Sequence, residues 1–261
     1  MQRFLITGAA GFIGSHLAEY LLSQGYYVVL LDNLEHGSRD NLPFLNSYDT
    51  SQYRFIEGDI RDKACCLDAT TNIDYVLHQA ALGSVPRSLE LPELYEDNNV
   101  KGTLTLLLAA RDNNIKKVIQ ASSASIYNNT PTLPKVETML PAPKSPYALS
   151  KLACEHYGSI FTQHYNLPVI SLRYFNVFGP RQNPNSQYAA VIPKFITAYL
   201  TNTAPEIYGD GEQTRDFTFI QNVVQANINS CYAEKEASGK AFNIGGYANI
   251  SVNTLAQKIK R

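Results

Sequence analysis

The sequence lacks a surplus of charge of either sign. Its 261 residues include 22 lysines and arginines and 23 aspartates and glutamates, which leaves a formal net charge of −1. Electrostatic binding of nucleic acid requires a basic surface, so we expect no nucleic-acid partner. A hydrophobic content of 44% with 17% charged residues excludes a disordered chain and predicts one large domain with a smaller lobe.

Long hydrophobic runs are also missing. No apolar run reaches the length that spans a membrane. The start of the chain, "MQRFLITGAAGFIG", has threonine and glycine where a signal peptide requires an unbroken apolar run. We therefore expect a cytoplasmic protein with no membrane contact.

Paired cysteines and clustered metal ligands are missing from the pattern. The four cysteines show no CxxC spacing, and Cys65 and Cys66 are adjacent, which is a poor geometry for a disulfide, so we expect reduced thiols. Cys154 is a candidate nucleophile by its place near the tyrosine and lysine described below, but no motif supports that role, and a buried free cysteine is the ordinary case. The histidines have no metal-ligand spacing to cysteine or carboxylate residues, so we predict no metal site.

What the sequence does have is an alternation of short apolar runs with longer segments of helical period. The predicted strands are "RFLIT", "YVVLLD", "YRFIEGD", "YVLHQA", "KKVIQAS" and "PVISLRY", and helices are expected over residues 11–24, 92–113 and 146–165. This alternation predicts an α/β fold, with a doubly wound parallel sheet over residues 1–175. Long polar loops follow, and they predict a smaller C-terminal substrate-binding lobe over residues 176–261.

Three glycines, Gly8, Gly11 and Gly14, follow the first predicted strand. In such a turn they permit a tight bend, a close approach of the backbone to a pyrophosphate, and close packing of helix on sheet. An ordinary strand-to-helix turn is the alternative. Asp32 at the end of the second strand weakens that alternative, because a carboxylate there accepts hydrogen bonds from adenosine ribose hydroxyls and repels a 2′-phosphate. With no arginine directly after Asp32, the pattern favours NAD over NADP.

The third predicted strand ends in "GDIRD", residues 58–62. Asp59 and Ile60 are placed to flank the adenine. For Asp62, a simple turn with a helix cap is a nearly equal alternative.

A tyrosine and a lysine share one helix face. Ser145 is a good N-cap and Pro146 a good first helical residue, so Tyr147 and Lys151 lie one turn apart. A surface pair is the alternative. However, "QASSASIY" ends the fifth strand at the sheet edge where such folds bind ligands, and it offers Ser122, Ser123 and Ser125.

These groups suit proton transfer. Ionising a phenol at neutral pH costs roughly 4 kcal/mol, and a neighbouring ammonium with an oxidised nicotinamide ring would offset much of it. We therefore predict Tyr147 as the general base, Lys151 as the group that stabilises the phenolate, and a serine hydroxyl as the group that positions the reacting oxygen.

Taken together, the glycine turn, the strand-end serine and Tyr147-x-x-x-Lys151 resemble the extended short-chain dehydrogenases/reductases, which have a Rossmann fold. The resemblance covers essentially the whole chain. Residues 79–88, 98–103, 173–196 and 208–217 are most similar to nucleotide-sugar 4-epimerases, especially bacterial UDP-N-acetylglucosamine 4-epimerases. The resemblance implies NAD as cofactor and a UDP-sugar as substrate.

The resemblance also implies individual roles. The catalytic residues would be Ser123, Tyr147 and Lys151, with Ser122 structural. The cofactor would be held by Gly8, Gly11, Phe12, Ile13, Gly14, Asp32, Asn33, Asp59, Ile60, Gln79, Ala80, Ala81, Asn98, Tyr147, Lys151, Tyr174 and Val177. The substrate would be held by Gly83, Ser84, Ser123, Ser125, Tyr147, Asn176, Ala190, Val191, Tyr208 and Arg215. Arg215 would fork onto the diphosphate, and its alternative is a salt bridge to Asp216 or Glu212.

The implied reaction is oxidation at C4 of the sugar, rotation of the 4-keto sugar, and return of the same hydride to the opposite face. One rival is another enzyme of the family, a dehydratase or a decarboxylase. Dehydratases carry Asp-Glu for elimination where this chain has Ala124-Ser125. The second rival is a non-catalytic NAD-binding sensor, which would usually lose the serine, tyrosine or lysine that this chain retains.

Two departures from the family concern a loop and the end of the chain. Asn128 replaces a usual glycine, and we expect it to alter only that loop. Family members continue past the position of Arg261, so the resemblance implies a substrate-binding lobe that is incomplete at its C-terminus. The helices expected at residues 92–113 and 146–165 match those that the family uses to dimerise, although helices that only cover a sheet show the same pattern. We expect a homodimer.

Overall fold

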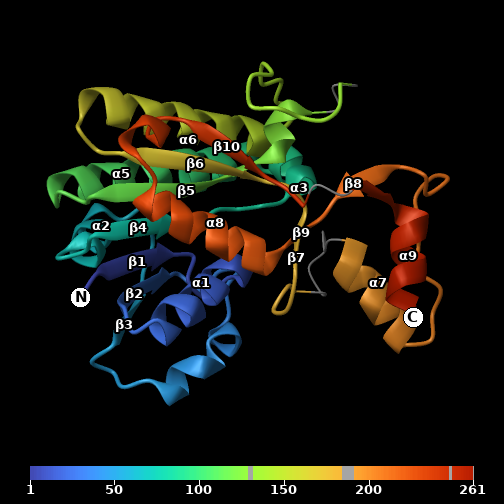
Figure 1. Cartoon of the computed structure of the whole chain (residues 1–261), viewed down its shortest axis with the longest axis horizontal. Coiled ribbons are helices and arrows are strands. Elements are labelled where there is room, and N and C mark those ends of the chain that lie inside the picture. Colours follow the sequence, from blue (N-terminus) through green and yellow to red (C-terminus); the bar gives the residue numbers. More distant parts are fainter. Residues whose placement is uncertain (129–131, 184–190, 247–248, 261) are drawn as a thin grey trace.

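A computed structural model describes residues 1–128, 132–183, 191–246 and 249–260 of the chain. A layered α/β body and a smaller lobe lie side by side (Figure 1). The centre of the body is a seven-stranded sheet with the order β10-β6-β5-β4-β1-β2-β3. Every pair of neighbouring strands in this sheet is parallel, which confirms the predicted doubly wound sheet. The strands are β1 (Arg3–Thr7), β2 (Tyr27–Asp32), β3 (Tyr53–Glu57), β4 (Tyr75–His78), β5 (Lys117–Ser123), β6 (Val169–Tyr174) and β10 (Ala241–Ile244).

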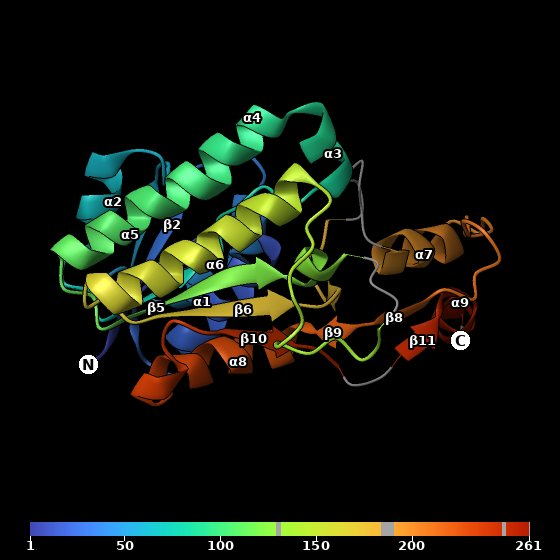
Figure 2. The same ribbon diagram turned by 90° about the horizontal axis from the view of Figure 1, so that it is seen from above.

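Helices cover both faces of the sheet, and each face has its own core. Figure 2 shows α5 (Gly102–Asp112) and α6 (Pro146–His164) on one side and α8 (Ile220–Tyr232) on the other. Successive residues of β2 serve different cores, since Leu30 packs in the cluster with α8 and Leu31 in the cluster with α5. A strand that is buried on both faces must be apolar at every position, which explains the continuous run "YVVLL".

The helix expected over residues 92–113 contains a local irregularity. It consists of α4 (Pro92–Tyr95), a π-helical turn (Glu96–Lys101) and α5. The wider turn buries Asn98 and Asn99. The side chain of Asn99 bonds to the backbone of Leu82 and to Ser150 Oγ, so the irregular turn ties this helix to the α6 helix and to the loop after β4.

The chain from residue 176 onward contributes to both parts of the molecule. Helices α7 (Val191–Leu200) and α9 (Val252–Lys260) pack together in the lobe, where β8 (Thr214–Asp216) pairs with β11 (Asn249–Ser251). Between them, α8 and β10 return to the large body, so residues 176–261 are not confined to the lobe. The return was not expected because β10 is only four residues long and half-buried, a weak pattern.

Two further helices of the body are α1 (Phe12–Ser23) and α2 (Lys63–Thr70). The remaining elements are shorter: α3 (Val85–Glu90), β7 (Val177–Phe178), β9 (Thr218–Phe219) and the 3₁₀ turns Arg39–Asn41, Pro43–Ser47, Ala124–Tyr127 and Lys235–Ala237. Within the described ranges, no helix is long and apolar enough to cross a membrane.

Candidate active site

The strand order reverses between β1 and β4, and a cavity of about 380 Å³ opens there at the carboxyl ends of the strands. Its lining is Gly8, Gly11, Phe12, Ile13, Gly14, Leu31, Asp32, Asn33, Glu35, His36, Gly37, Gly58, Asp59, Ile60, Gln79, Ala80, Ala81, Leu82, Gly83 and Asn98. All the predicted cofactor residues up to Asn98 are among them. Leu31, one of the residues that the sequence interpretation missed, lies in β2, and the others lie in the segments that follow β2, β3 and β4. Extending the search further past each strand end would have found His36 and Gly37.

The glycine turn has the geometry that a bound phosphate needs. Gly8 has a φ of +67°, and a Cβ there would lie 2.7 Å from the Ala80 nitrogen. A Cβ on Gly14 would lie 2.1 Å from the Gly8 carbonyl oxygen, so only glycine allows this contact of turn and helix. Gly11 is the N-cap of α1 and has no side chain to bond the first N–H groups of the helix. Those N–H groups are therefore available to an anion.

Asp32 is held in position by the backbone. Its Oδ2 accepts a hydrogen bond from Ala10 N at 2.8 Å, and its Oδ1 accepts one from Leu34 N at 2.8 Å. Burial raises the pKa of Asp32, while these two bonds oppose the shift. Each oxygen keeps a second lone pair, so the carboxylate fits the ribose hydroxyls of a dinucleotide.

The Asp59 carboxylate lies at the far end of the cavity. Hydrogen bonds from Arg61 lower its pKa to about 2, and Asn33 Nδ2 donates to Asp59 Oδ2 at 3.1 Å. Arg61 also pairs with Asp97, at 2.9 Å. Asp59 is therefore ionised at any working pH and its oxygens are fixed.

The predicted catalytic residues lie together at the end of β5. Tyr147 occupies the first turn of α6, and its hydroxyl lies near Ser123, whose side chain lowers the pKa of the phenol. The Tyr95 ring meets the Tyr147 ring edge-on, with the centroids 6.3 Å apart. Lys151 Nζ donates to the Ala121 carbonyl at 2.9 Å, so the lysine joins α6 to β5.

The electrostatics differ from the sequence expectation in one respect. Burial raises the pKa of Tyr147, and of its neighbours it is Ser123, not Lys151, that lowers it. Burial lowers the pKa of Lys151, which weakens its ability to stabilise a phenolate, although the charges of Cys154 and Glu155 oppose this shift. Desolvation of both groups is the physical reason.

The three serines have three different environments. Ser122 Oγ donates to the buried carboxylate of Glu155, as expected for a structural residue. Ser123 Oγ accepts a hydrogen bond from Ser125 N at 3.1 Å. Ser125 Oγ is buried, and among the described residues it has no hydrogen-bond partner. A buried hydroxyl without a partner is costly, so Ser125 is available to a ligand.

Cys154 is not a nucleophile in this arrangement. Its thiol donates to the Asn99 carbonyl at 3.3 Å, and burial raises its pKa. The reactive form of cysteine is the thiolate, which burial disfavours here.

Several predicted cofactor and substrate residues do not reach the cavity wall. Tyr174 lies behind it, where its hydroxyl donates to Gln79 Oε1 at 3.2 Å, and Val177 lies in β7. Asn176 Nδ2 donates to the Asp216 carbonyl at 2.8 Å. Ser84 Oγ caps α3 by accepting from Arg87 N at 3.2 Å.

The predicted uridine and diphosphate residues lie on the lobe. Tyr208 is 70% exposed, and Val191 begins α7 and packs on the lobe core. The two carboxylates proposed as salt-bridge partners of Arg215 bond elsewhere. Glu212 Oε1 accepts from Asn253 at 2.6 Å, and Asp216 Oδ1 accepts from the Gly246 backbone at 2.8 Å. Ala190 lies outside the described residues.

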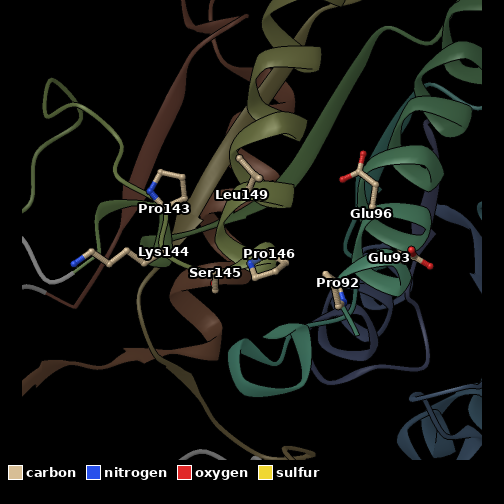
Figure 3. A pocket seen from close by; sticks show the side chains of 8 residues that line it. All are labelled: Pro92, Glu93, Glu96, Pro143, Lys144, Ser145, Pro146 and Leu149. Carbon is tan, nitrogen blue, oxygen red and sulfur yellow. The ribbon is translucent and has the colours of Figure 1, made fainter. Parts of the chain in front are cut away.

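A second cavity, of about 530 Å³, lies between α4 and the start of α6 (Figure 3). Its lining is Pro92, Glu93, Glu96, Pro143, Lys144, Ser145, Pro146 and Leu149. None of these is a predicted site residue, so the larger cavity is not the candidate active site. Over the described ranges, no three histidine, cysteine or carboxylate side chains are grouped so that they could hold a metal ion.

The features expected of a nucleotide-dependent oxidoreductase site are a glycine turn that can receive a phosphate, an aspartate whose oxygens fit ribose hydroxyls, and a Ser–Tyr–Lys group, and they lie together at one sheet edge here. The chain belongs to the NAD dependent epimerase/dehydratase family, whose sequence pattern matches residues 4–245. This confirms the resemblance to the extended short-chain dehydrogenases/reductases, and the cofactor is NAD.

Several individual relatives are enzymes that act on nucleotide sugars. A putative UDP-glucose 4-epimerase of Methanocaldococcus jannaschii is 39% identical over 98% of this chain and 81% of its own. The structure of a UDP-N-acetylglucosamine 4-epimerase from Methanobrevibacter ruminantium, in complex with UDP-N-acetylmuramic acid, has a TM-score of 0.92 and 41% identity, over 98% of this chain and 80% of that one. A UDP-glucose 4-epimerase of Thermus thermophilus in complex with NAD has a TM-score of 0.85 and 35% identity, over 99% and 82%. A decarboxylase and a 4,6-dehydratase of nucleotide sugars match at 36% and 35% identity.

Proposed function

We propose that this protein is an NAD-dependent 4-epimerase of UDP-hexoses, which interconverts UDP-N-acetylglucosamine and UDP-N-acetylgalactosamine. The observation that carries the proposal is that Tyr147 and Ser123 meet at the sheet edge that also holds the cofactor cavity, with the Ser123 side chain lowering the pKa of the Tyr147 phenol.

The chain's own groups can perform the proton transfers. NAD, when bound, supplies the acceptor for the hydride from C4 and later returns that hydride. Tyr147 takes the proton of the C4 hydroxyl, and Ser123 holds the reacting oxygen in line with the phenol. The 4-keto sugar then rotates in the site so that its opposite face is presented. Tyr147 returns the proton to the C4 oxygen when the hydride returns to that face. Lys151 keeps the tyrosine helix against β5 through its bond to Ala121.

The preference for an N-acetylated sugar rests on space and on one hydroxyl. A Cβ on Gly83 would meet nothing within 4 Å, so this side of the cavity has room for a bulky substituent. The unpartnered hydroxyl of Ser125 offers a hydrogen bond to the sugar. In this proposal, Asn176, Ala190, Val191 and Tyr208 hold the sugar and uridine, and Arg215 holds the diphosphate. The second candidate is a UDP-glucose 4-epimerase, the activity named for several of the relatives.

Dehydration is less well supported. Elimination of water needs an acid and a base next to the catalytic serine or threonine, and Ala124 has no titratable group. The position of Ser125 likewise offers a hydroxyl instead of a carboxylate.

Assembly into a homodimer is a further part of the proposal. The outer side of α6 exposes apolar side chains along its length, with Leu149 56% exposed and Ile160 43% exposed. A second copy would bury this row. Ile160→Glu should then shift the mass measured by light scattering from dimer to monomer, and a monomeric wild-type protein would contradict the dimer.

The activity test uses the NAD-loaded protein and proton NMR. With UDP-N-acetylglucosamine, the anomeric signal of the galacto epimer should appear without added reductant. Tyr147→Phe should abolish it while the NAD content stays unchanged, and Tyr165→Phe, which removes a hydroxyl at the far end of α6, should leave it intact. Conversion of UDP-glucose alone would favour the second candidate. No conversion of either sugar by protein with bound NAD would refute the epimerase proposal.

A further inference from the structure

We propose that His36 and Arg87 form a bridge across the cofactor cavity that slows the release of NAD. Arg87 Nη1 lies 2.8 Å from His36 Nε2, between segments that are 51 residues apart in the chain. A guanidinium can only donate, so Nε2 accepts, and the imidazole in this contact is neutral with its proton on Nδ1.

The bridge joins the two walls of the cavity. His36 lines one wall together with Glu35 and Gly37, in the segment after β2. The opposite wall is formed by residues 81–83, and α3, which carries Arg87, begins two residues later. The contact therefore links the segment that forms one wall to the helix that directly follows the other wall.

The wall that carries His36 is fixed in place. Leu34 N donates to Asp32 Oδ1 at 2.8 Å, and Ser38 N donates to the Ala10 carbonyl at 3.0 Å. Both bonds attach the segment of His36 to the glycine turn and to the ribose-binding aspartate.

The wall that carries Arg87 is fixed as well. Ser84 Oγ accepts from Arg87 N, and Ser84 N donates to Tyr95 OH at 3.1 Å. The side-chain amide of Asn99 binds the backbone of Leu82 twice: Asn99 Oδ1 accepts from Leu82 N, and Asn99 Nδ2 donates to the Leu82 carbonyl.

The bridge itself is exposed, in contrast to its supports. The side chain of His36 is 49% exposed, so the contact can open without disturbing either wall. A bridge of this kind delays the exit of a bound molecule and still permits exchange.

The positive charge of Arg87 would also favour retention of NAD. The described residues that line the cavity include the carboxylates of Asp32, Glu35 and Asp59 but no lysine or arginine. The diphosphate of NAD is negative, so a guanidinium over the cavity reduces the repulsion from these carboxylates. In an enzyme that oxidises and then reduces the same sugar, escape of the cofactor between the two steps would abort the cycle, and this consequence rests on the proposed function.

The test measures cofactor release and does not depend on turnover. The protein is loaded with radiolabelled NAD, an excess of unlabelled NAD is added, and the loss of label is followed. His36→Ala should release NAD roughly five- to tenfold faster, Arg87→Gln at least as fast as His36→Ala, and the double variant no faster than Arg87→Gln alone. His36→Gln keeps a side-chain acceptor and should recover part of the retention.

Arg39→Gln is the matched control. It removes a nearby guanidinium that pairs with Glu57 on the exposed surface, so its release rate should stay within about twofold of the wild type. Unchanged release in His36→Ala would overturn the bridge, whatever Arg87→Gln does, and so would effects that multiply in the double variant. A protein that retains NAD but does not epimerise would contradict the proposed function and leave the bridge standing.

Discussion

Arg173 and Glu155 form a two-point ion pair inside the protein. Nε and Nη2 of Arg173 lie 2.9 and 2.8 Å from the two carboxylate oxygens, and both side chains are less than one-tenth exposed. The same carboxylate accepts from Ser122, and Arg173 Nη1 donates to Tyr127 OH at 2.5 Å. The pair therefore connects β6 with α6, the helix of Tyr147, and the bond from Ser122 connects β5, the strand of Ser123, with the same carboxylate.

Replacing Arg173 with methionine should destabilise the fold strongly. Glu155 would stay buried without its partner, which costs about 3–5 kcal/mol. In a chain of this size the melting temperature should fall by roughly 6–20 °C in calorimetry. Arg54→Met is the control, because its pair with Asp68 is about half exposed and contributes below about 1 kcal/mol. Equal losses in both variants would contradict the role of the buried pair.

Ser122 and Ser125 should separate stability from substrate binding. Ser122→Ala takes a donor from Glu155 and should reduce the free energy of unfolding by about 1–3 kcal/mol. Ser125→Ala removes a hydroxyl that has no partner among the described residues, so stability should not fall, while KM for the UDP-sugar rises roughly five- to tenfold. Urea unfolding and initial rates measure the two effects. The reverse assignment would remove Ser125 from the sugar site.

His78 should make the protein sensitive to mild acid. Its ring lies between Thr7 Oγ1, at 2.7 Å from Nδ1, and Thr103 Oγ1, at 2.9 Å from Nε2. Burial lowers its pKa to about 3, and the charge of Lys151 acts in the same direction. The unfolded chain, with a histidine pKa near 6.5, binds the extra proton below that pH, so stability is lost as the pH falls from about 6.5 toward 3.

The size of this effect is roughly 1.4 kcal/mol for each pH unit. Urea unfolding at pH 7, 6 and 5 should show it, and His78→Gln, which can still bond both threonines, should flatten the slope. His164→Gln at the exposed end of α6 should keep the wild-type slope. If the His78 variant keeps the wild-type slope as well, another group is responsible.

Gly14→Ala should impair NAD binding through the backbone. The new methyl group would lie 2.1 Å from the Gly8 carbonyl oxygen, so the helix must move away from the turn. We expect a loss of about 1–3 kcal/mol in stability and at least a tenfold weaker binding of NAD in calorimetric titration. Ser23→Ala, at the exposed end of the same helix, should change neither. Wild-type affinity in Gly14→Ala would show that the turn can relax.

Local patterns predicted the doubly wound sheet and most of the residues that line the cavity at its carboxyl edge. Short spacings in the sequence were enough to predict the positions of the glycines, of Asp32 and of the pair of Tyr147 and Lys151. A tight turn, a strand end and one helical turn fix the geometry of these residues locally. The strand order then follows from the handedness of the crossovers.

Contacts between distant segments could not be predicted in the same way. Tyr174 ends a strand, as Asp32 does, but it faces Gln79 and Asn227 in the core, and nothing in its own neighbourhood indicates that direction. The contact between His36 and Arg87 depends on where two loops meet after folding. The pKa of Tyr147 depends on how much water the finished fold removes, which spacing does not reveal.

Because α8 and β10 pack back onto the large body, the nucleotide-binding half cannot be cut cleanly from the rest of the chain. A fragment ending at residue 175 would leave β6 as an open edge, with its hydrogen-bonding groups free to pair with another copy. It would also uncover the apolar surface that Ile220, Val223 and Ile228 now seal. The nucleotide-binding half is therefore not an autonomous module, and such a fragment is expected to self-associate through its strands.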